Sequence, residues 1–208
     1  MKILITGSNG LLGQYLIELF SKDKAFEVVA TGKGPNRLKL QEGYLYEDAD
    51  LTQKEVITAL VNKHKPGVII HSGAMTQADS CERDKEACRA TNVTATQHLL
   101  EASDAFFLFL STDFVFDGLA GPYREDDLVN PISYYGASKV AAERIVQAAS
   151  TPWAIARTVL VYGVSDDPKR TNIITWVKDN LEQHKPIKVV DDQWRTPTLV
   201  HDLAIGCK

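Results

Sequence analysis

A tyrosine and a lysine stand four residues apart at Tyr135 and Lys139, within the segment YGASK. On a helix, side chains four residues apart share one face, so the phenol and the ammonium can converge on one point. Free tyrosine has a pKa of about 10 and is a poor proton donor or acceptor at neutral pH. A fixed cation a few Å away favours the phenolate and lowers that pKa toward the working range. The spacing therefore predicts a proton-transfer pair, with an ordinary pair on a helix surface as the alternative.

Two adjacent hydroxyls, Ser111 and Thr112, follow the apolar run from Phe106 to Leu110. A hydroxyl at the end of a strand can donate a hydrogen bond to a substrate carbonyl oxygen and stabilise the charge that develops there. We expect Thr112 to take this role, with Ser111 as the second candidate. The alternative is a turn in which both hydroxyls bond to their own backbone.

Glycines recur with the spacing GxxGxxG between Gly7 and Gly13, directly after the apolar run from Lys2 to Thr6. Glycine allows positive φ and leaves no Cβ between the backbone and a bound phosphate. A helix that starts here adds unpaired N–H groups and a partial positive charge, both of which attract an anion. The pattern predicts a dinucleotide site, whereas a glycine turn before an ordinary helix is the alternative. The residues expected to line the diphosphate are Gly7, Asn9, Gly10, Leu11, Leu12 and Gly13.

The segment after the second apolar run indicates which dinucleotide fits. A carboxylate there would bind the adenosine ribose of NAD, whereas a basic residue would accept the 2′-phosphate of NADP. Residues 30–37, ATGKGPNR, contain no acid and offer Lys33 and Arg37. Because lysine and arginine pair with phosphate, we expect NADP(H) rather than NAD(H), with a solvated basic loop as the alternative.

Alternating strands and helices must position these residues. Apolar runs indicate strands at residues 2–6, 26–31, 44–50, 68–71, 106–110 and 153–161. Helical periodicity marks residues 11–20, 53–64, 82–102 (one or two helices) and 135–149. This alternation predicts an α/β fold, a Rossmann-like doubly wound parallel sheet covered on both faces. Ligands bind such sheets at the carboxyl ends of the strands, which is where the glycine turn and the hydroxyls fall.

Composition limits the partners. The chain has 208 residues and a net charge of −4, so it offers no broad basic field for nucleic acid or an anionic membrane. It lacks an apolar run of about 18 residues, and its first apolar stretch is too short for a signal peptide. Three cysteines without CxxC fit reduced thiols in a cytoplasmic protein, and no cluster has metal-ligand spacing. On one helix Cys81 and Cys88 would lie about 10 Å apart, too far to bond.

Three segments, STDFVFDG, NPISYYGASKVAAE and DDQWRTPT, resemble the dTDP-4-dehydrorhamnose reductase family of extended short-chain reductases. The glycine spacing, the segment after the fourth strand and ARTVLVYG at the sixth agree, so the resemblance runs across nearly the whole chain. It implies a catalytic triad of Thr112, Tyr135 and Lys139. It also implies that the Gly73-Ala74 turn passes close to the cofactor and that Asn92 fixes a helix near the site.

The resemblance further implies that NADPH delivers hydride to the C4 keto carbon of a nucleotide-linked deoxysugar while Tyr135 supplies the proton. In this superfamily an acidic residue often lies beside the adenine, which suggests Asp50 and the adjacent Leu51 as adenine contacts. An N-cap for the helix expected from Gln53 onward accounts equally well for Asp50 and Thr52. The expected substrate contacts are Thr76, Asp113, Asn172, Trp176, Gln193, Arg195 and Thr198. Arg195 can pair with a diphosphate. For Trp176 and Trp194, the alternative is a structural role in packing the small lobe.

The chain departs from the family pattern in sequence and in length. Residues 71–74, HSGA, stand where an asparagine and alanines are usual, and Arg195 stands where glycine is commoner. Because the family is longer, we expect residues 1–161 to form the NADP(H)-binding domain and residues 162–208 part of a small, truncated substrate lobe. The alternatives are a nucleotide-sugar epimerase or dehydratase, and a non-catalytic NADP-binding regulatory subunit of S-adenosylmethionine synthesis enzymes. A homodimer is an open alternative to a monomer.

Overall fold

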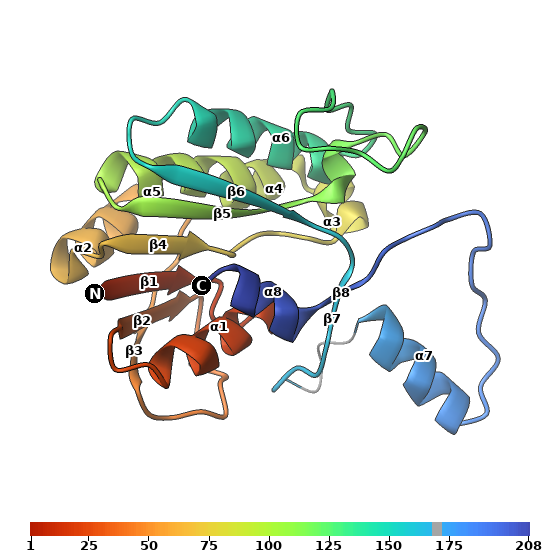
Figure 1. Cartoon of the computed structure of the whole chain (residues 1–208), viewed down its shortest axis with the longest axis horizontal. Coiled ribbons are helices and arrows are strands. Elements are labelled where there is room, and N and C mark those ends of the chain that lie inside the picture. The colour runs from red at the N-terminus through yellow and green to blue at the C-terminus, as the bar shows by residue number, and fades with distance from the viewer. Residues whose placement is uncertain (168–171) are drawn as a thin grey trace.

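A six-stranded parallel sheet forms the centre of the protein in the computed structural model, which describes residues 1–167 and 172–208 (Figure 1). The strands are β1 (Lys2–Thr6), β2 (Glu27–Gly32), β3 (Tyr44–Asp48), β4 (Val68–His71), β5 (Phe106–Thr112) and β6 (Trp153–Thr158). Their order is β3-β2-β1-β4-β5-β6, so the direction of winding reverses between β1 and β4. The expected doubly wound, Rossmann-like fold is confirmed, and its switch point lies at the glycine turn that follows β1.

Helices cover both faces of the sheet. The helices on one face are α2 (Lys54–His64), α5 (Ala95–Ala102) and α6 (Tyr134–Gln147), and those on the other are α1 (Leu11–Ser21) and α8 (Val200–Gly206). Alternate residues of β5 serve the two layers: Phe107 and Phe109 pack under the first group, and Leu108 and Leu110 under the second. Because both faces are buried, β5 reads as a continuous apolar run rather than an alternating one.

The helical span expected at residues 82–102 starts earlier and is broken. It contains α3 (Ala78–Arg83), α4 (Lys85–Arg89), the π-helical turn η1 (Ala90–Thr94) and α5. The break lies at Asp84, which leaves helical geometry (φ −131, ψ 80) and accepts a hydrogen bond from the N–H of Ala87 at 2.9 Å. Through this break Cys81 and Cys88 become neighbours in one buried cluster with Tyr135. The separation expected for them assumed one continuous helix and is wrong, although both thiols are free.

The strand expected at residues 153–161 ends earlier, at Thr158. Leu160 has φ +36, a left-handed conformation that no strand accommodates. The chain then forms β7 (Val161–Tyr162), which pairs in parallel with β8 (Thr198–Leu199) as a separate small sheet. Helix α7 (Ile173–Glu182) stands beyond it with no buried residue. The last helix, α8, returns to pack against α1, with Val200 and Ala204 buried (Figure 1).

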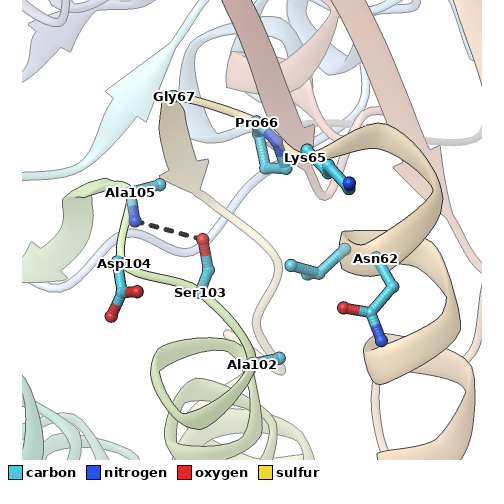
Figure 2. A pocket seen from close by; sticks show the side chains of 9 residues that line it. Asn62, Lys65, Pro66, Gly67, Ala102, Ser103, Asp104 and Ala105 are labelled. Atoms are coloured by element: carbon cyan, nitrogen blue, oxygen red, sulfur yellow. Dashed lines mark hydrogen bonds between the residues drawn. The ribbon is translucent and has the colours of Figure 1, made fainter.

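An open depression of about 360 Å³ lies at the amino end of the sheet, between the carboxyl ends of α2 and α5 (Figure 2). Lys65, Pro66 and Gly67 line one side, and Ser103 and Asp104 line the other. This position is opposite the carboxyl ends of the strands, so the depression is not part of the expected site. Within the described residues, no helix has the length and apolar character needed to cross a membrane.

Candidate active site

The glycine turn brings three backbone segments into close contact. Gly7 has φ +70, and a Cβ there would lie 2.7 Å from the backbone nitrogen of Gly73. A Cβ on Gly13 would collide with the carbonyl oxygen of Gly7. Glycine is therefore required at both positions, so that β1 can turn against the segment after β4 and α1 can pack against that turn. Gly73 lies beside the turn, as its expected position near the cofactor requires.

The start of α1 fits an anionic group. Its N-cap is Gly10, with extended backbone (φ −84, ψ 169), and no side chain caps the helix. The first N–H groups, those of Leu11, Leu12 and Gly13, have no intrahelical acceptor and add to the positive end of the helix dipole. With no Cβ at Gly7 or Gly10, the backbone is open to close approach, so the residues present fit a dinucleotide diphosphate.

The side chain of Asn9 joins this turn to the basic loop after β2. Its Oδ1 accepts a hydrogen bond from the N–H of Arg37 (2.9 Å), and its Nδ2 donates to the hydroxyl of Tyr46 (3.0 Å) and the carbonyl of Pro35 (3.1 Å). Tyr46 also donates to the carbonyl of Gly34 (2.6 Å). Asn9 was expected to contact the cofactor, and in this structure it fixes the loop that carries Arg37. Tyr46 belongs to no motif, so sequence analysis missed it.

Lys33 and Asp50, expected to contact different parts of an adenosine, form an ion pair with Nζ and Oδ2 2.7 Å apart. A hydrogen bond from Lys33 is the largest cause that lowers the pKa of Asp50 to about 2. Asp50 also accepts hydrogen bonds from the N–H and the hydroxyl of Thr52 (3.0 and 2.7 Å). The N-cap of α2 is Gln53, so the alternative in which Asp50 caps that helix is wrong. The side chain of the neighbouring Leu51 lies beside Gly73.

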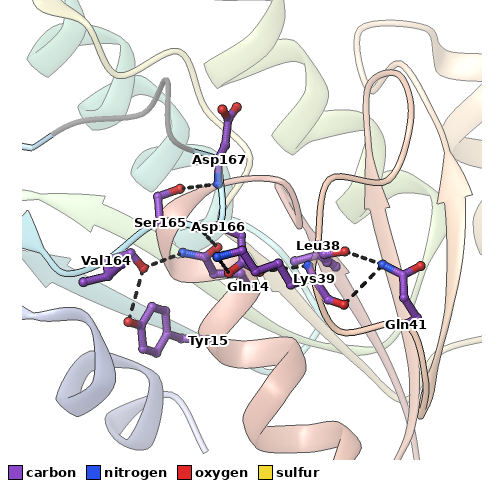
Figure 3. A network of polar contacts seen from close by, with 9 residues as sticks. All are labelled: Gln14, Tyr15, Leu38, Lys39, Gln41, Val164, Ser165, Asp166 and Asp167. Atoms are coloured by element: carbon purple, nitrogen blue, oxygen red, sulfur yellow. Dashed lines mark hydrogen bonds and ion pairs between the residues drawn. The ribbon is translucent and has the colours of Figure 1, made fainter.

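The segment after β7 crosses α1 and the basic loop (Figure 3). Gln14 donates to the carbonyl of Val164 (3.1 Å) and accepts from the N–H of Asp166 (2.8 Å). The carboxylate of Asp166 accepts from the N–H of Lys39 (3.0 Å), and that of Asp167 lies 3.6 Å from Arg37. Arg37, expected at the 2′-phosphate, therefore already faces a carboxylate more than a hundred residues away in sequence.

Thr112 ends β5, and the buried Tyr135 and Lys139 lie on α6, which packs against β5. Tyr135 and Lys139 are both buried, and Thr112 lies within hydrogen-bonding reach of the phenol. The Tyr135 ring meets Phe114 edge-on with centroids 5.6 Å apart. The ammonium of Lys139 lies 3.9 Å from the ring centroid of Phe109. Tyr135 and Lys139, four residues apart, are both buried on α6.

The start of α6 is fixed by contacts that sequence analysis did not identify. Ser133 caps the helix by accepting a hydrogen bond from the N–H of Gly136 (3.1 Å), and Glu82 accepts one from the N–H of Tyr134 (2.6 Å). A Cβ on Gly136 would collide with the carbonyl oxygen of Phe114. Glycine here lets α6 approach the turn after β5, which brings the phenol of Tyr135 to Thr112. Ser133, a preferred N-cap residue directly before the helical run, is a signal that could have indicated this cap.

Burial controls the protonation of the pair. Burial raises the pKa of Tyr135 to about 12, and the nearby hydroxyl of Thr112 opposes that rise in part. Burial also lowers the pKa of Lys139 to about 7, against the attraction of Glu143 one turn further along. The expectation that a fixed cation lowers the tyrosine pKa is wrong in this structure. The reason is that loss of water disfavours the phenolate and the ammonium alike.

Comparison with known proteins identifies the family. The model of the RmlD substrate binding domain matches residues 1–208. This chain belongs to the RmlD family. Two RmlD-like relatives are dTDP-4-dehydrorhamnose reductase of Aggregatibacter actinomycetemcomitans and methionine adenosyltransferase 2 subunit beta of Xenopus laevis. They are 30% and 31% identical to 98% and 99% of this chain, which spans 65% and 60% of their lengths.

Solved structures support the same assignment. A dTDP-4-dehydrorhamnose reductase from Bacillus anthracis in complex with NADP superposes with a TM-score of 0.81 at 28% identity, covering 99% of this chain and 68% of that one. A UDP-glucuronic acid 4-epimerase from Bacillus cereus, in complex with UDP-glucuronic acid and NAD, gives 0.87 at 25% identity, with 100% and 72% covered. The RmlD chain therefore has the fold of a superfamily of oxidoreductases whose members bind nicotinamide dinucleotides.

Asn92 connects the turn after β4 to α6 in this RmlD chain. It is buried in the π-helical turn η1, where its Oδ1 accepts from the N–H of Met75 (2.7 Å). Its Nδ2 donates to the carbonyl of Met75 (3.0 Å) and to the hydroxyl of Ser138 (2.9 Å). Because Ser138 adjoins Lys139, Asn92 holds α6 against the turn that follows Gly73-Ala74. This contact agrees with the role that the family resemblance implied.

The expected substrate contacts of the RmlD chain separate into two groups. Asp113 and Arg195 form an ion pair at 3.0 Å beside Thr112. The side chain of Asn172 is occupied as the N-cap of α7, where it forms a capping box with Thr175. The remaining residues are Trp176 within α7, Gln193 and Thr76 on exposed coil, and Thr198 in β8. Trp194 is 94% exposed, so the packing role considered for it is wrong.

His71, a departure from the usual family pattern, is a buried structural residue. Its Nδ1 lies 2.7 Å from the hydroxyl of Thr6 and its Nε2 lies 3.1 Å from that of Thr96. Burial lowers its pKa to about 3, so the ring is neutral and links β1, β4 and α5. Ser111, the second candidate for the catalytic hydroxyl, has a buried Oγ without a hydrogen-bond partner and lies next to Thr112 at the end of β5.

Proposed function

We propose that this chain is an NADPH-dependent reductase whose substrate is a nucleotide-linked 4-keto-6-deoxysugar. The observation that carries the proposal is the position of Thr112 at the end of β5 beside the phenol of Tyr135, with Lys139 buried one turn further along α6. The glycine turn, on the same edge of the sheet, fits a diphosphate. The reductase relative and the NADP complex in the same fold support this assignment.

The proposed cofactor contacts follow from the fit of the glycine turn. The N–H groups at the start of α1 would bind the diphosphate, and Lys139 would bind the nicotinamide ribose. Lys33 and Arg37 would accept the 2′-phosphate once it displaces their carboxylate partners, Asp50 and Asp167. When bound, the dinucleotide supplies the hydride for the C4 carbon of the sugar. NADPH is preferred over NADH in this proposal because the end of β2 carries cations and no acid.

The chain's own side chains handle the carbonyl oxygen. Thr112 donates a hydrogen bond that stabilises the developing negative charge, and the phenol of Tyr135 transfers its proton to that oxygen. Reduction requires a protonated phenol, and burial, which raises the pKa of Tyr135 to about 12, keeps it protonated at neutral pH. An ammonium at Lys139 would stabilise the phenolate left after transfer, and its pKa of about 7 leaves a substantial fraction of Lys139 protonated at neutral pH.

The deciding experiment measures NADPH oxidation with dTDP-4-keto-6-deoxyhexose for the unmodified chain, Tyr135→Phe and Tyr134→Phe. Tyr134 is the matched control, because it is the adjacent tyrosine and its ring lies near Lys85 rather than Thr112. We expect loss of about 10²–10⁴-fold in kcat for Tyr135→Phe, typical of a missing general acid, and a small change for Tyr134→Phe. No turnover by the unmodified chain, or equal turnover by Tyr135→Phe, contradicts the proposal.

The same assay separates the rivals on this scaffold. An epimerase or dehydratase returns the hydride to the sugar, so product would form without net loss of NADPH. A non-catalytic regulatory subunit would bind the dinucleotide without oxidising it. The similarity to methionine adenosyltransferase 2 subunit beta favours this second candidate, and the intact Tyr135 and Lys139 pair favours an enzyme. Copurification with a methionine adenosyltransferase catalytic subunit, without any NADPH oxidation, would select the regulatory role.

Residues 162–208 contribute the proposed substrate side of the site. The small β7–β8 sheet and α7 extend away from the six-stranded sheet, and the coil between α7 and β8 returns to Asp113 through Arg195 (Figure 1). We assign the sugar nucleotide to the space that this part of the chain borders. Residues 1–161 supply the proposed cofactor contacts.

A further inference from the structure

One carboxylate links the coil before β8 to the catalytic turn. Asp113 accepts a hydrogen bond from the hydroxyl of Thr112 at its Oδ1 (3.1 Å) and one from Nη1 of Arg195 at its Oδ2 (3.0 Å). The Arg195 guanidinium also lies 5.2 Å from the ring centroid of Phe114. Asp113 is only 19% exposed, which protects the ion pair from screening by solvent. Residues 82 positions apart in sequence thus share one hydrogen-bonded network.

The hydroxyl of Thr112 has a single proton to donate. It already accepts a hydrogen bond from the N–H of Phe114 (3.2 Å), which leaves the proton directed at Asp113. To stabilise a substrate oxygen, Thr112 must turn this proton away from the carboxylate. A carboxylate holds a donor more strongly when its charge is unshared, because hydrogen bonds to ionised groups are the stronger ones. The charge on Asp113 therefore decides how readily Thr112 can act.

We propose that Arg195 is a positioning residue that, by sharing the charge of Asp113, releases the Thr112 proton for the substrate oxygen and holds its coil against the site. The proposal rests on the proposed reductase function and adds to it. It differs from the expectation that Asp113 and Arg195 each bind substrate directly. Arg195 acts on the reaction through Asp113, and the two residues form a unit with Thr112.

The kinetic test is a double-mutant cycle that compares Arg195→Gln, Asp113→Asn and the double variant with the unmodified chain. Arg195→Gln should lower kcat about tenfold with less than a twofold change in KM. Asp113→Asn should retain most of kcat, because a neutral amide oxygen holds the Thr112 proton weakly. The double variant should recover most of the kcat lost in Arg195→Gln, since the cost exists only while the Asp113 charge is present. Arg195→Lys keeps a cation and should restore at least half of kcat.

Two kinetic results overturn the proposal. A rise in KM with unchanged kcat in Arg195→Gln would make Arg195 a plain substrate-binding residue. Failure of Asp113→Asn to recover activity in the Arg195→Gln background would show that Arg195 does not act through Asp113. The matched control is Lys188→Gln, which removes an exposed cation from the same coil and should change neither constant.

A second measurement needs no turnover, so it separates this proposal from the reductase assignment. Amide hydrogen exchange of Thr198, whose N–H donates to the carbonyl of Val159 (3.1 Å) directly after the coil, is compared in the unmodified chain, Arg195→Gln and Lys188→Gln. Exchange should accelerate several-fold in Arg195→Gln only, because that variant loses the contact with Asp113. Unchanged exchange in Arg195→Gln refutes the proposed attachment of the coil, whatever the activity. If exchange is faster in Arg195→Gln and the unmodified chain oxidises no NADPH, the attachment of the coil through Arg195 is supported and the reductase function is contradicted.

Discussion

The carboxylate of Glu143 and the guanidinium of Arg157 meet through two hydrogen bonds, from Nε to Oε1 (3.0 Å) and from Nη2 to Oε2 (2.8 Å). Glu143 lies on α6, one turn beyond Lys139, and Arg157 lies on β6 opposite Ser111 of β5. Arg157 also donates to the carbonyl of Glu125 (2.9 Å). The pair therefore fixes α6 over the end of the strand that carries Thr112.

Removing one partner of this pair should be costly. Glu143→Ala leaves Arg157 largely buried without its counter-ion, so we expect the free energy of unfolding to fall by about 3 kcal/mol. Urea denaturation followed by circular dichroism measures the loss. The matched control is Glu101→Ala, which breaks the exposed ion pair with Lys54 and should change stability little. Equal effects of the two substitutions would show that burial does not set the strength of the first pair.

The glycine turn should not tolerate a side chain. Gly7→Ala forces alanine into φ +70 and places a Cβ 2.7 Å from the Gly73 backbone, so stability should fall by about 2 kcal/mol or more. The affinity for NADPH, measured by its fluorescence, should also fall, because the glycine turn must move away from the Gly73 backbone to make room for the Cβ. Gly206→Ala is the control: a Cβ there meets open space in α8, and stability should stay equal or rise by up to about 1 kcal/mol. Unchanged NADPH affinity in Gly7→Ala would exclude this turn as the diphosphate site.

Cofactor choice should depend on the basic loop. Lys33→Ala combined with Arg37→Ala removes both cations, so the affinity for NADPH relative to NADH should fall at least tenfold. Asp50→Asn should raise the affinity for NADPH relative to NADH, because it frees Lys33 from its ion-pair partner at 2.7 Å. Isothermal titration of both cofactors gives the ratio. A ratio unchanged in the double variant would show that these residues form a solvated loop.

The buried His71 should make the protein sensitive to moderate acid. Burial lowers its pKa from 6.5 to about 3, so between these pH values the unfolded chain binds a proton that the folded chain does not. Stability from this residue is therefore complete above pH 6.5 and is lost as pH falls, by about 1.4 kcal/mol per pH unit. His71→Asn should lose this slope between pH 6 and pH 4 while keeping the contribution of the carboxylates. If the free energy of unfolding falls equally with pH in the unmodified chain and in His71→Asn, the assignment of a neutral His71 ring is contradicted.

Some of the site could be predicted because it depends on short spacings. A helix places Tyr135 and Lys139 on one face whatever surrounds it, and glycines after a buried strand predict a tight turn at Gly7 in the same way. The apolar runs predicted the six strands of the sheet because a sheet buried on both faces needs them. The end of β6 and the break at Asp84 were missed, since backbone geometry there is fixed by packing that no local pattern records.

By itself, the sequence determined the fold class, the glycine turn and the side chains available for chemistry, because these follow from periodicity and from residue type. Only the tertiary structure decided their partners and charge. It paired Lys33 with Asp50 and Arg195 with Asp113, and it buried Tyr135 deeply enough to raise the pKa of its phenol to about 12. Ion pairs and burial depend on segments brought together by the whole folded chain, so a pattern confined to neighbouring residues does not contain them.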